Sequence, residues 1–193
     1  MSVKPSGVML KTNMDVKVLM ESLMKLADVE VLVGFPEDTT NRPPSEDEPP
    51  GITNASLGYI HDNGAPEQGI PARPFMIPGI QAAQTKVADK LGQILKATVA
   101  GRGGQTLVAQ GMTQVGIIAS LSIKNTINDG IDPALAASTL KARARKGRKG
   151  AQKELDRRAK GEAPSTAFAK PLVDTGEMRN AITYVIRSRK KRK

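Results

Sequence analysis

The sequence contains no cysteine and no tryptophan, and His61 is its only histidine. Without cysteine the chain has no disulfide, no thiolate nucleophile and no Cys-ligated zinc site, which fits synthesis in a reducing cytoplasm. Aromatic residues make up 3% of the chain, so Val, Ile, Leu, Met and Ala must supply the core. Because the hydrophobic fraction is only 39%, burial against neighbouring subunits would help to stabilise that core.

Long hydrophobic runs are also missing. Residues 1–11 lack the apolar stretch of a secretory signal peptide, and no uninterrupted run approaches the roughly 18 apolar residues of a membrane span. We therefore expect a soluble protein that makes no contact with a membrane. The length of 193 residues predicts a single domain, residues 1–193, with extended segments attached to it.

The charge is unevenly distributed along the chain, although the formal net charge is +10. Residues 1–80 contain 6 Lys and Arg against 11 Asp and Glu, whereas residues 81–193 contain 23 Lys and Arg against 8 Asp and Glu. Such a bipolar chain favours head-to-tail contacts between copies, in which an acidic surface meets a basic one.

Apolar periodicity predicts helices and strands in alternation with loops. We expect helices over residues 14–26, over 54–63 with Asn54 as the N-cap, and over 78–99, followed by a long helix that ends at residues 129–133; the last two form an αα-hairpin around a Gly-rich turn. The expected apolar faces of the hairpin consist of Ile80, Val87, Leu91, Ile94 and Leu95 in the first helix, and of Val108, Met112, Val115, Ala119, Ile123 and Ile127 in the second. Alternating residues predict strands over 29–35 and 181–186. Residues 36–51 are rich in Pro and acid and are predicted to form a long exposed loop or an arm that becomes ordered on assembly. The prolines of residues 70–78 favour extended backbone. The fold class is therefore α+β, with a small, mostly antiparallel sheet packed against long helices.

Two segments are strongly basic. Residues 141–160 contain 10 Lys and Arg against 2 Asp and Glu, and residues 187–193 contain six cations. We interpret the first as a solvated basic arm or a segment that a partner orders. Both can bind DNA phosphates or an acidic protein surface, and the absence of interleaved aromatics argues against base stacking. The residues of the tail that would face DNA are Arg187, Arg189, Lys190, Lys191 and Arg192.

Candidates for catalysis are few. His61 has Asp62 beside it, but a general base or metal centre needs more partners at fixed geometry. Asp174-Thr175-Gly176 resembles the active-site loop of retroviral-type aspartic proteases, in which two paired carboxylates activate water. Glu177 stands where that family usually has a small residue, and the alternative is a capping-box-like pair of Asp174 and Glu177. We expect no enzymatic activity, no cofactor and no metal.

Three stretches, in this order and spacing, resemble the tail-completion, or virion-morphogenesis, proteins of the head–tail neck of tailed bacteriophages. They are residues 31–35, residues 54–64 leading into Ile70-Pro71-Ala72-Arg73-Pro74-Phe75, and residues 171–182 with Leu172-Val173-Asp174-Thr175-Gly176. The resemblance extends from about residue 14 to residue 187. The acidic loop and the basic arm are longer than the family needs.

The resemblance implies a structural virion protein, assembled in the bacterial cytoplasm into a ring, by analogy a hexamer. The ring would join the tail to the head connector, contact other neck and tail-tube proteins, and let DNA pass; tail-terminator and head-closure roles are the alternatives within the neck. In this interpretation Arg73, Pro74 and Phe75 form a subunit interface, with Arg73 paired to a carboxylate and Phe75 as the anchor. Asp174 and Gly176 would set the turn into the last strand. The loop and the basic arm would serve ring assembly.

Overall fold

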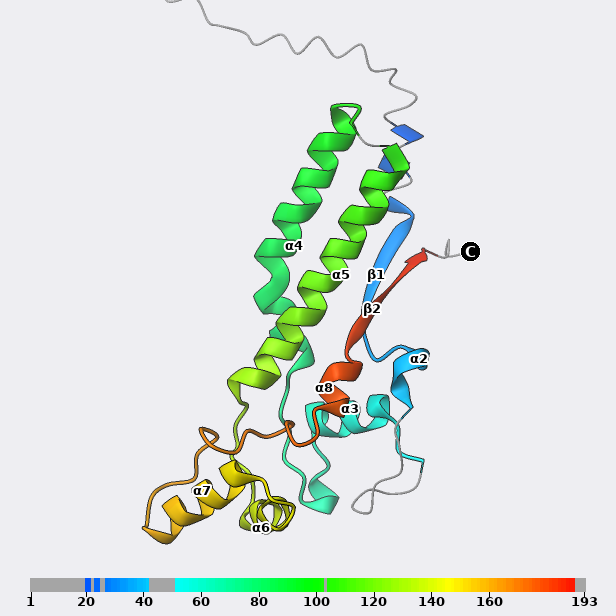
Figure 1. The fold of residues 1–193 in the computed structure, drawn as a ribbon. Helices are drawn as coiled ribbons and strands as arrows, with labels where there is room; N and C mark the ends of the chain where they lie inside the picture. Colours follow the sequence, from blue (N-terminus) through cyan, green and yellow to red (C-terminus); the bar gives the residue numbers. More distant parts are fainter. Residues whose placement is uncertain (1–19, 22, 25–26, 42–50, 103, 190–193) are drawn as a thin grey trace, which may run out of the picture.

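The computed structural model describes residues 20–21, 23–24, 27–41, 51–102 and 104–189. Two long antiparallel helices form an elongated hairpin, with a two-stranded sheet beside one of them and shorter helices gathered at one end (Figure 1). The predicted α+β class, a small antiparallel sheet packed against long helices, is confirmed. Most of the predicted helix 14–26 lies outside the described residues.

The hairpin consists of α4 (Met76–Val99) and α5 (Gly104–Asp129), as predicted. Gly79 and Gly111 let the two helices approach closely, since a Cβ on Gly79 would lie 2.6 Å from the Cα of Ile123. The predicted apolar face of α5 is buried along its length; it consists of Val108, Met112, Val115, Ala119, Ile123 and Ile127.

The predicted apolar face of α4 is only partly correct. Ile94 is buried, but Ile80, Leu91 and Leu95 are exposed. Small residues such as Gly79 and Ala83 make the close contact with α5, so the larger side chains lie outside it. α4 also begins at Met76, which makes the last three residues of the expected extended segment 70–78 helical.

α5 has the length and composition of a membrane-spanning helix over Thr106–Asp129. It packs against α4 and against both strands, and 44% of its most apolar window is buried inside the molecule. Its apolar character is therefore explained by its position as the central helix of the fold.

The sheet pairs β1 (Val29–Gly34) with β2 (Thr183–Ser188) in antiparallel register, so that Val31 faces Ile186 and Leu32 faces Val185. Both strands were predicted. One face of the sheet lies against α5, where Val29 and Val31 contact the cluster of Ile94, Val108 and Met112. Tyr184 packs so tightly on Gly116 that any side chain there would clash with its ring.

The shorter elements lie at the far end of the hairpin (Figure 1). They are α2 (Glu37–Thr40), α3 (Asn54–Asn63), the 3-10 turn η1 (Pro66–Gln68) and α8 (Glu177–Ala181). α2 replaces the start of the predicted loop 36–51 with one helical turn. Thr53 rather than Asn54 caps α3, because its side chain accepts a hydrogen bond from Ser56 N. Asn54 is instead buried and donates to the carbonyl of Thr39.

The basic segment 141–160 is not an extended arm. It folds into α6 (Ala137–Arg145) and α7 (Lys149–Ala159), which pack around a small core of Leu135, Leu140, Ala151 and Ala169. Gly150 allows this packing, since a Cβ there would lie 2.1 Å from the Phe168 carbonyl oxygen. The segment is therefore folded into two packed helices, and its interpretation as a solvated arm is wrong. Most of its cations are nevertheless exposed to solvent.

Candidate functional site

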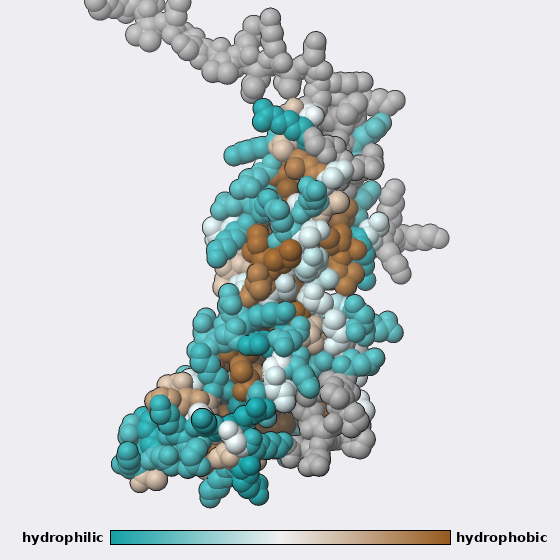
Figure 2. All heavy atoms as spheres, in the orientation of Figure 1, coloured by the Kyte–Doolittle hydropathy of each residue, from teal (hydrophilic) through white to brown (hydrophobic). Residues whose placement is uncertain are grey.

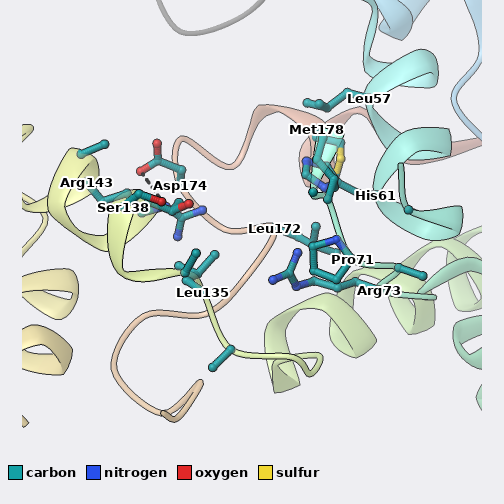
Figure 3. A pocket seen from close by; sticks show the side chains of 18 of the residues that line it. Leu57, His61, Pro71, Arg73, Leu135, Ser138, Arg143, Leu172, Asp174 and Met178 are labelled. Carbon is teal, nitrogen blue, oxygen red and sulfur yellow. Dashed lines mark ion pairs between the residues drawn. The ribbon is translucent and has the colours of Figure 1, made fainter. Parts of the chain in front are cut away.

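A groove of about 1170 Å³ lies between the end of α3, the segment 64–73, helix α6 and the segment 172–178 (Figure 3). Residues within 57–73 and 172–178, from two of the three stretches singled out in the sequence, line it directly. The remaining stretch, residues 31–35, does not line the groove. It ends at Phe35, whose ring lies against Gly58 of α3, so close that a Cβ on Gly58 would come within 2.4 Å of the ring. The fold thus brings together segments more than a hundred residues apart in sequence.

Asp62 fixes the wall of the groove next to α3. Its Oδ1 accepts hydrogen bonds from the backbone N–H groups of Phe75, at 2.7 Å, and Met76, at 3.0 Å, and so caps the start of α4. Gly64 has a φ of +79° and ends α3, and a Cβ there would lie 2.7 Å from Ala72 N. The sequence showed Asp62 only as a neighbour of His61, because a cap between separate helices leaves no local signal.

Arg73 lies between the two contacts just described, that of Gly64 with Ala72 and that of Asp62 with Phe75. Its backbone N–H donates to the carbonyl of His61 at 2.8 Å, and its Nε donates to the carbonyl of Pro133 at 3.0 Å. The residue is only 6% exposed, and its guanidinium points across the groove toward α6 (Figure 3). Burial, and then the positive charge of Arg143, lower the pKa of Arg73.

Asp174 lies on the opposite side of the groove. Its Oδ1 is 3.0 Å from the Nε of Arg148 and 4.0 Å from the Nε of Arg143. Arg143 also donates to the carbonyls of Lys170 and Val173, and burial lowers its pKa although Asp174 opposes that shift. Asp174 therefore attaches the basic helices to the segment that leads into α8.

This geometry corrects the expected capping role of Asp174. α8 begins at Glu177 after Gly176, which adopts a left-handed φ of +84°, and Glu177 N is 3.3 Å from Thr175 Oγ1. Gly176 makes the turn into α8, and this short helix lies between Gly176 and the last strand, β2. The neighbours of Asp174 are guanidinium groups rather than a second carboxylate, which gives the aspartic-protease interpretation no support.

Phe75 does not have the surface position expected of an interface anchor. It is fully buried in the core of its own chain, against Ile123, Ile127, Met178 and Ile182. Arg73 likewise pairs with a backbone carbonyl of its own chain, and of the three predicted interface residues of this segment only Pro74 is exposed. The short proline-braced segment therefore crosses the molecule and carries its two large side chains inward.

A buried ion cluster holds α7 against the segment that follows it. Glu154 on α7 is fully buried and accepts hydrogen bonds from Arg157 at 3.0 Å, Arg158 at 2.9 Å and Ser165 N at 2.8 Å. Burial alone would raise the pKa of Glu154, but these hydrogen bonds outweigh burial and lower the pKa to about 2. Sequence reasoning missed this cluster, because a Glu in a basic run is indistinguishable from a surface charge.

The first two residues of the basic tail, Arg187 and Ser188, belong to β2. Arg187 forms an ion pair with Glu30 across the two strands, and Arg189 is exposed. Lys190, Lys191 and Arg192 lie outside the described residues. No group of three or more potential metal ligands occurs among the residues that the structure describes. Comparison with family models, curated proteins and solved structures finds no match to this chain.

Proposed function

We propose that this chain is a structural subunit of the head–tail neck of a tailed bacteriophage, a tail-completion protein that acts without catalysis. The observation that carries the proposal is that two of the three resembling stretches line one groove, while the third ends at Phe35, which packs on Gly58 of α3. Residues from 54–75 and 171–182 thus form one surface although they are far apart in sequence, as expected if the resembling stretches belong to one shared architecture.

Exposed apolar surface supports association with further copies (Figure 2). On α4 the exposed apolar side chains fall within an arc of about 100° along the helix. We call them the α4 stripe, which consists of Ile77, Ile80, Leu91, Leu95 and Val99. Ile117 and Leu121 on α5 are also exposed. Apolar surface of this kind marks an interaction site in a protein that acts in an assembly.

The sheet also favours association. A two-stranded sheet is marginally stable alone, and among the described residues each strand pairs on one edge only. On the side of the sheet facing away from α5, the cross-strand partners Leu32 and Val185 are both exposed. A strand or helix of an adjacent subunit would cover these groups in a ring.

The test is the assembly state of the purified full-length chain. We expect light scattering coupled to size-exclusion chromatography to give a discrete oligomer, by analogy a hexamer, and negative-stain images to show closed rings that bind phage tails or head connectors. A chain that stays monomeric at every concentration and binds neither component would overturn the proposal. The position of the bound ring would separate tail completion from the tail-terminator and head-closure alternatives in the virion.

Non-specific DNA binding is a second candidate, because the helices α6 and α7 present a dense array of exposed cations. They are Lys141, Arg145, Lys146, Arg148, Lys149, Lys153 and Lys160. We expect duplex DNA to bind with an affinity that falls steeply with salt. If the tail also contacts phosphates, deletion of residues 187–193 should lower the affinity for DNA at a given salt concentration. DNA binding by rings would agree with a channel for DNA, whereas binding by a stable monomer alone would favour the second candidate.

A further inference from the structure

The groove contains a buried cation that lacks a counterion. Arg73 is 94% buried, yet no carboxylate among the described residues lies within ion-pair distance of its guanidinium, and its only side-chain hydrogen bond in that part of the chain is from Nε to Pro133. The charge that acts on it most strongly is another cation, Arg143. A buried charge costs free energy unless it is paired. An anion from outside the described residues would therefore bind favourably to the guanidinium of Arg73.

The lining indicates what kind of anion fits. Apolar side chains of Leu57, Leu135, Leu172 and Met178 surround the charged centre, and the described lining of the groove contains no Phe, Tyr or Trp on which a nucleic-acid base could stack (Figure 3). A guanidinium fork matches a carboxylate in two-point geometry, and the apolar walls suit the stem of an acidic side chain or its neighbours in a peptide. An acidic peptide therefore fits better than a nucleic acid.

The chain itself contains such a peptide. Glu46, Asp47 and Glu48 are consecutive, and Pro43-Pro44 and Pro49-Pro50 flank them. Flanking prolines reduce the entropy that an extended peptide loses when it binds. Among the described residues, Glu154, Asp174 and Asp62 are engaged in contacts of their own, whereas the acidic run is a concentrated source of carboxylates in the acidic part of the sequence.

We propose that the groove around Arg73 binds a carboxylate of the acidic run Glu46–Glu48 from a second copy of this chain. This inference rests on the proposed function, because it supplies the head-to-tail contact that a ring needs. A heterologous contact, in which one surface of each copy meets a different surface of the next, closes into a ring when the rotation permits.

The first experiment measures peptide binding to the full chain, in a variant whose own acidic run is neutralised, E46Q/D47N/E48Q. The probe is a fluorescent peptide of residues 43–51. We expect a version of the peptide with Gln, Asn and Gln in place of the acids to bind at least about tenfold more weakly. Equal affinity for the two peptides would overturn the proposal, and this comparison leaves the protein unchanged.

Variants then locate the contact. Arg73→Gln should lose about tenfold or more in affinity for the acidic peptide. Arg145→Gln, which removes the same charge from an exposed α6 position outside the groove, should bind as the parent does. If the control loses as much as the Arg73 variant, the interaction is diffuse attraction to basic helices and the proposal fails. Inorganic phosphate should compete only at much higher concentration than the peptide.

Mixing two variants tests whether the contact joins different copies. Arg73→Gln keeps the acidic run, and E46Q/D47N/E48Q keeps the groove. Each alone should associate weakly, and an equimolar mixture should recover association, seen as a pair by light scattering. A contact within one chain gives no recovery and would overturn the proposal. If rings form but the peptide does not bind, the contact at the groove is refuted and the proposed function stands. If the peptide binds but the chain never forms rings, the proposed function is refuted and the groove remains a binding site for the acidic run.

Discussion

The two ends of the molecule are stabilised in different ways. At one end, α4, α5 and the sheet pack through apolar side chains and glycines, as at Gly79 against Ile123 and Gly116 against Tyr184. At the other end, α6 and α7 enclose only a small apolar core, and the buried Glu154 joins Arg157, Arg158 and the backbone of Ser165. The stability of the first end comes from close apolar packing, whereas the stability of the second depends strongly on the ionised carboxylate of Glu154.

In the proposed assembly, this difference would separate two requirements of a subunit. The apolar end leaves hydrophobic side chains on its surface, where other copies can cover them. The charged end keeps most of its cations exposed on two helices, and one buried carboxylate offsets part of their mutual repulsion. Substitutions and pH should therefore affect the two ends independently.

The largest expected effect follows from removal of the buried charge. Glu154→Gln leaves Arg157 and Arg158 without their shared carboxylate, and breaking a buried ion pair in this way costs about 3 kcal/mol or more. Urea unfolding monitored by circular dichroism would measure the loss, and hydrogen exchange should show it concentrated in α6 and α7. Glu162→Gln is the control, because this exposed partner of Arg157 should contribute less than about 1 kcal/mol. Equal losses in the two variants would contradict the central role of Glu154.

Acid should weaken the same end selectively. The pKa of Glu154 is lowered from its ordinary value of 4.5 to about 2 in the folded chain. A lowered folded pKa means that the stabilisation is complete above the unfolded value and is lost as the pH falls from about 4.5 toward 2. Hydrogen exchange measured across this interval should show α7 opening before α5, and Glu154→Gln should remove this contribution to the pH dependence. Opening of α5 and α7 at the same pH would contradict the independent stabilisation of the two ends.

At the apolar end, two glycines of α4 should respond in opposite directions. A Cβ on Gly79 would lie 2.6 Å from the backbone of Ile123, so Gly79→Ala should destabilise the hairpin by about 1–3 kcal/mol. Gly92 has nothing within 4 Å of the same position, so Gly92→Ala should stabilise the helix by about 0.5–1 kcal/mol. Thermal unfolding of the two variants provides the measurement, and a shift of the same sign in both would contradict the packing described here.

Sequence patterns predicted the apolar end much better than the charged end. The periodic apolar residues of α5 and the alternation of Val29, Val31 and Val33 are local signals, and they gave the helix and the strand close to their observed bounds. Residues 141–160 have few large apolar side chains, so their folding depends on Glu154 and on contacts with the distant Phe168–Ala169 segment. Such contacts leave no periodicity.

The groove shows the same limit. The motif residues Arg73, Asp174 and Gly176 were recognised, but the inward direction of Phe75 and the cap that Asp62 gives to α4 depend on tertiary contacts. The resemblance suggested Phe75 as an interface anchor, and the sequence pattern could not correct this, because an extended segment between prolines has no periodicity that distinguishes an inward side chain from an outward one.

The smallest effect on folding should accompany a strong effect on assembly. Leu95 lies in the α4 stripe and is 42% exposed, so Leu95→Lys should change the free energy of unfolding of the isolated subunit by less than about 0.5 kcal/mol. If a second copy covers the stripe, the buried lysine would shift the oligomer toward monomers in light scattering. Gln93→Lys adds the same charge about 200° around the helix and should leave the assembly intact, because that position is exposed on the other side of α4. Dissociation by both variants would indicate a general charge effect, and dissociation by neither would place the subunit contact elsewhere, on the outer face of the sheet or at the groove around Arg73.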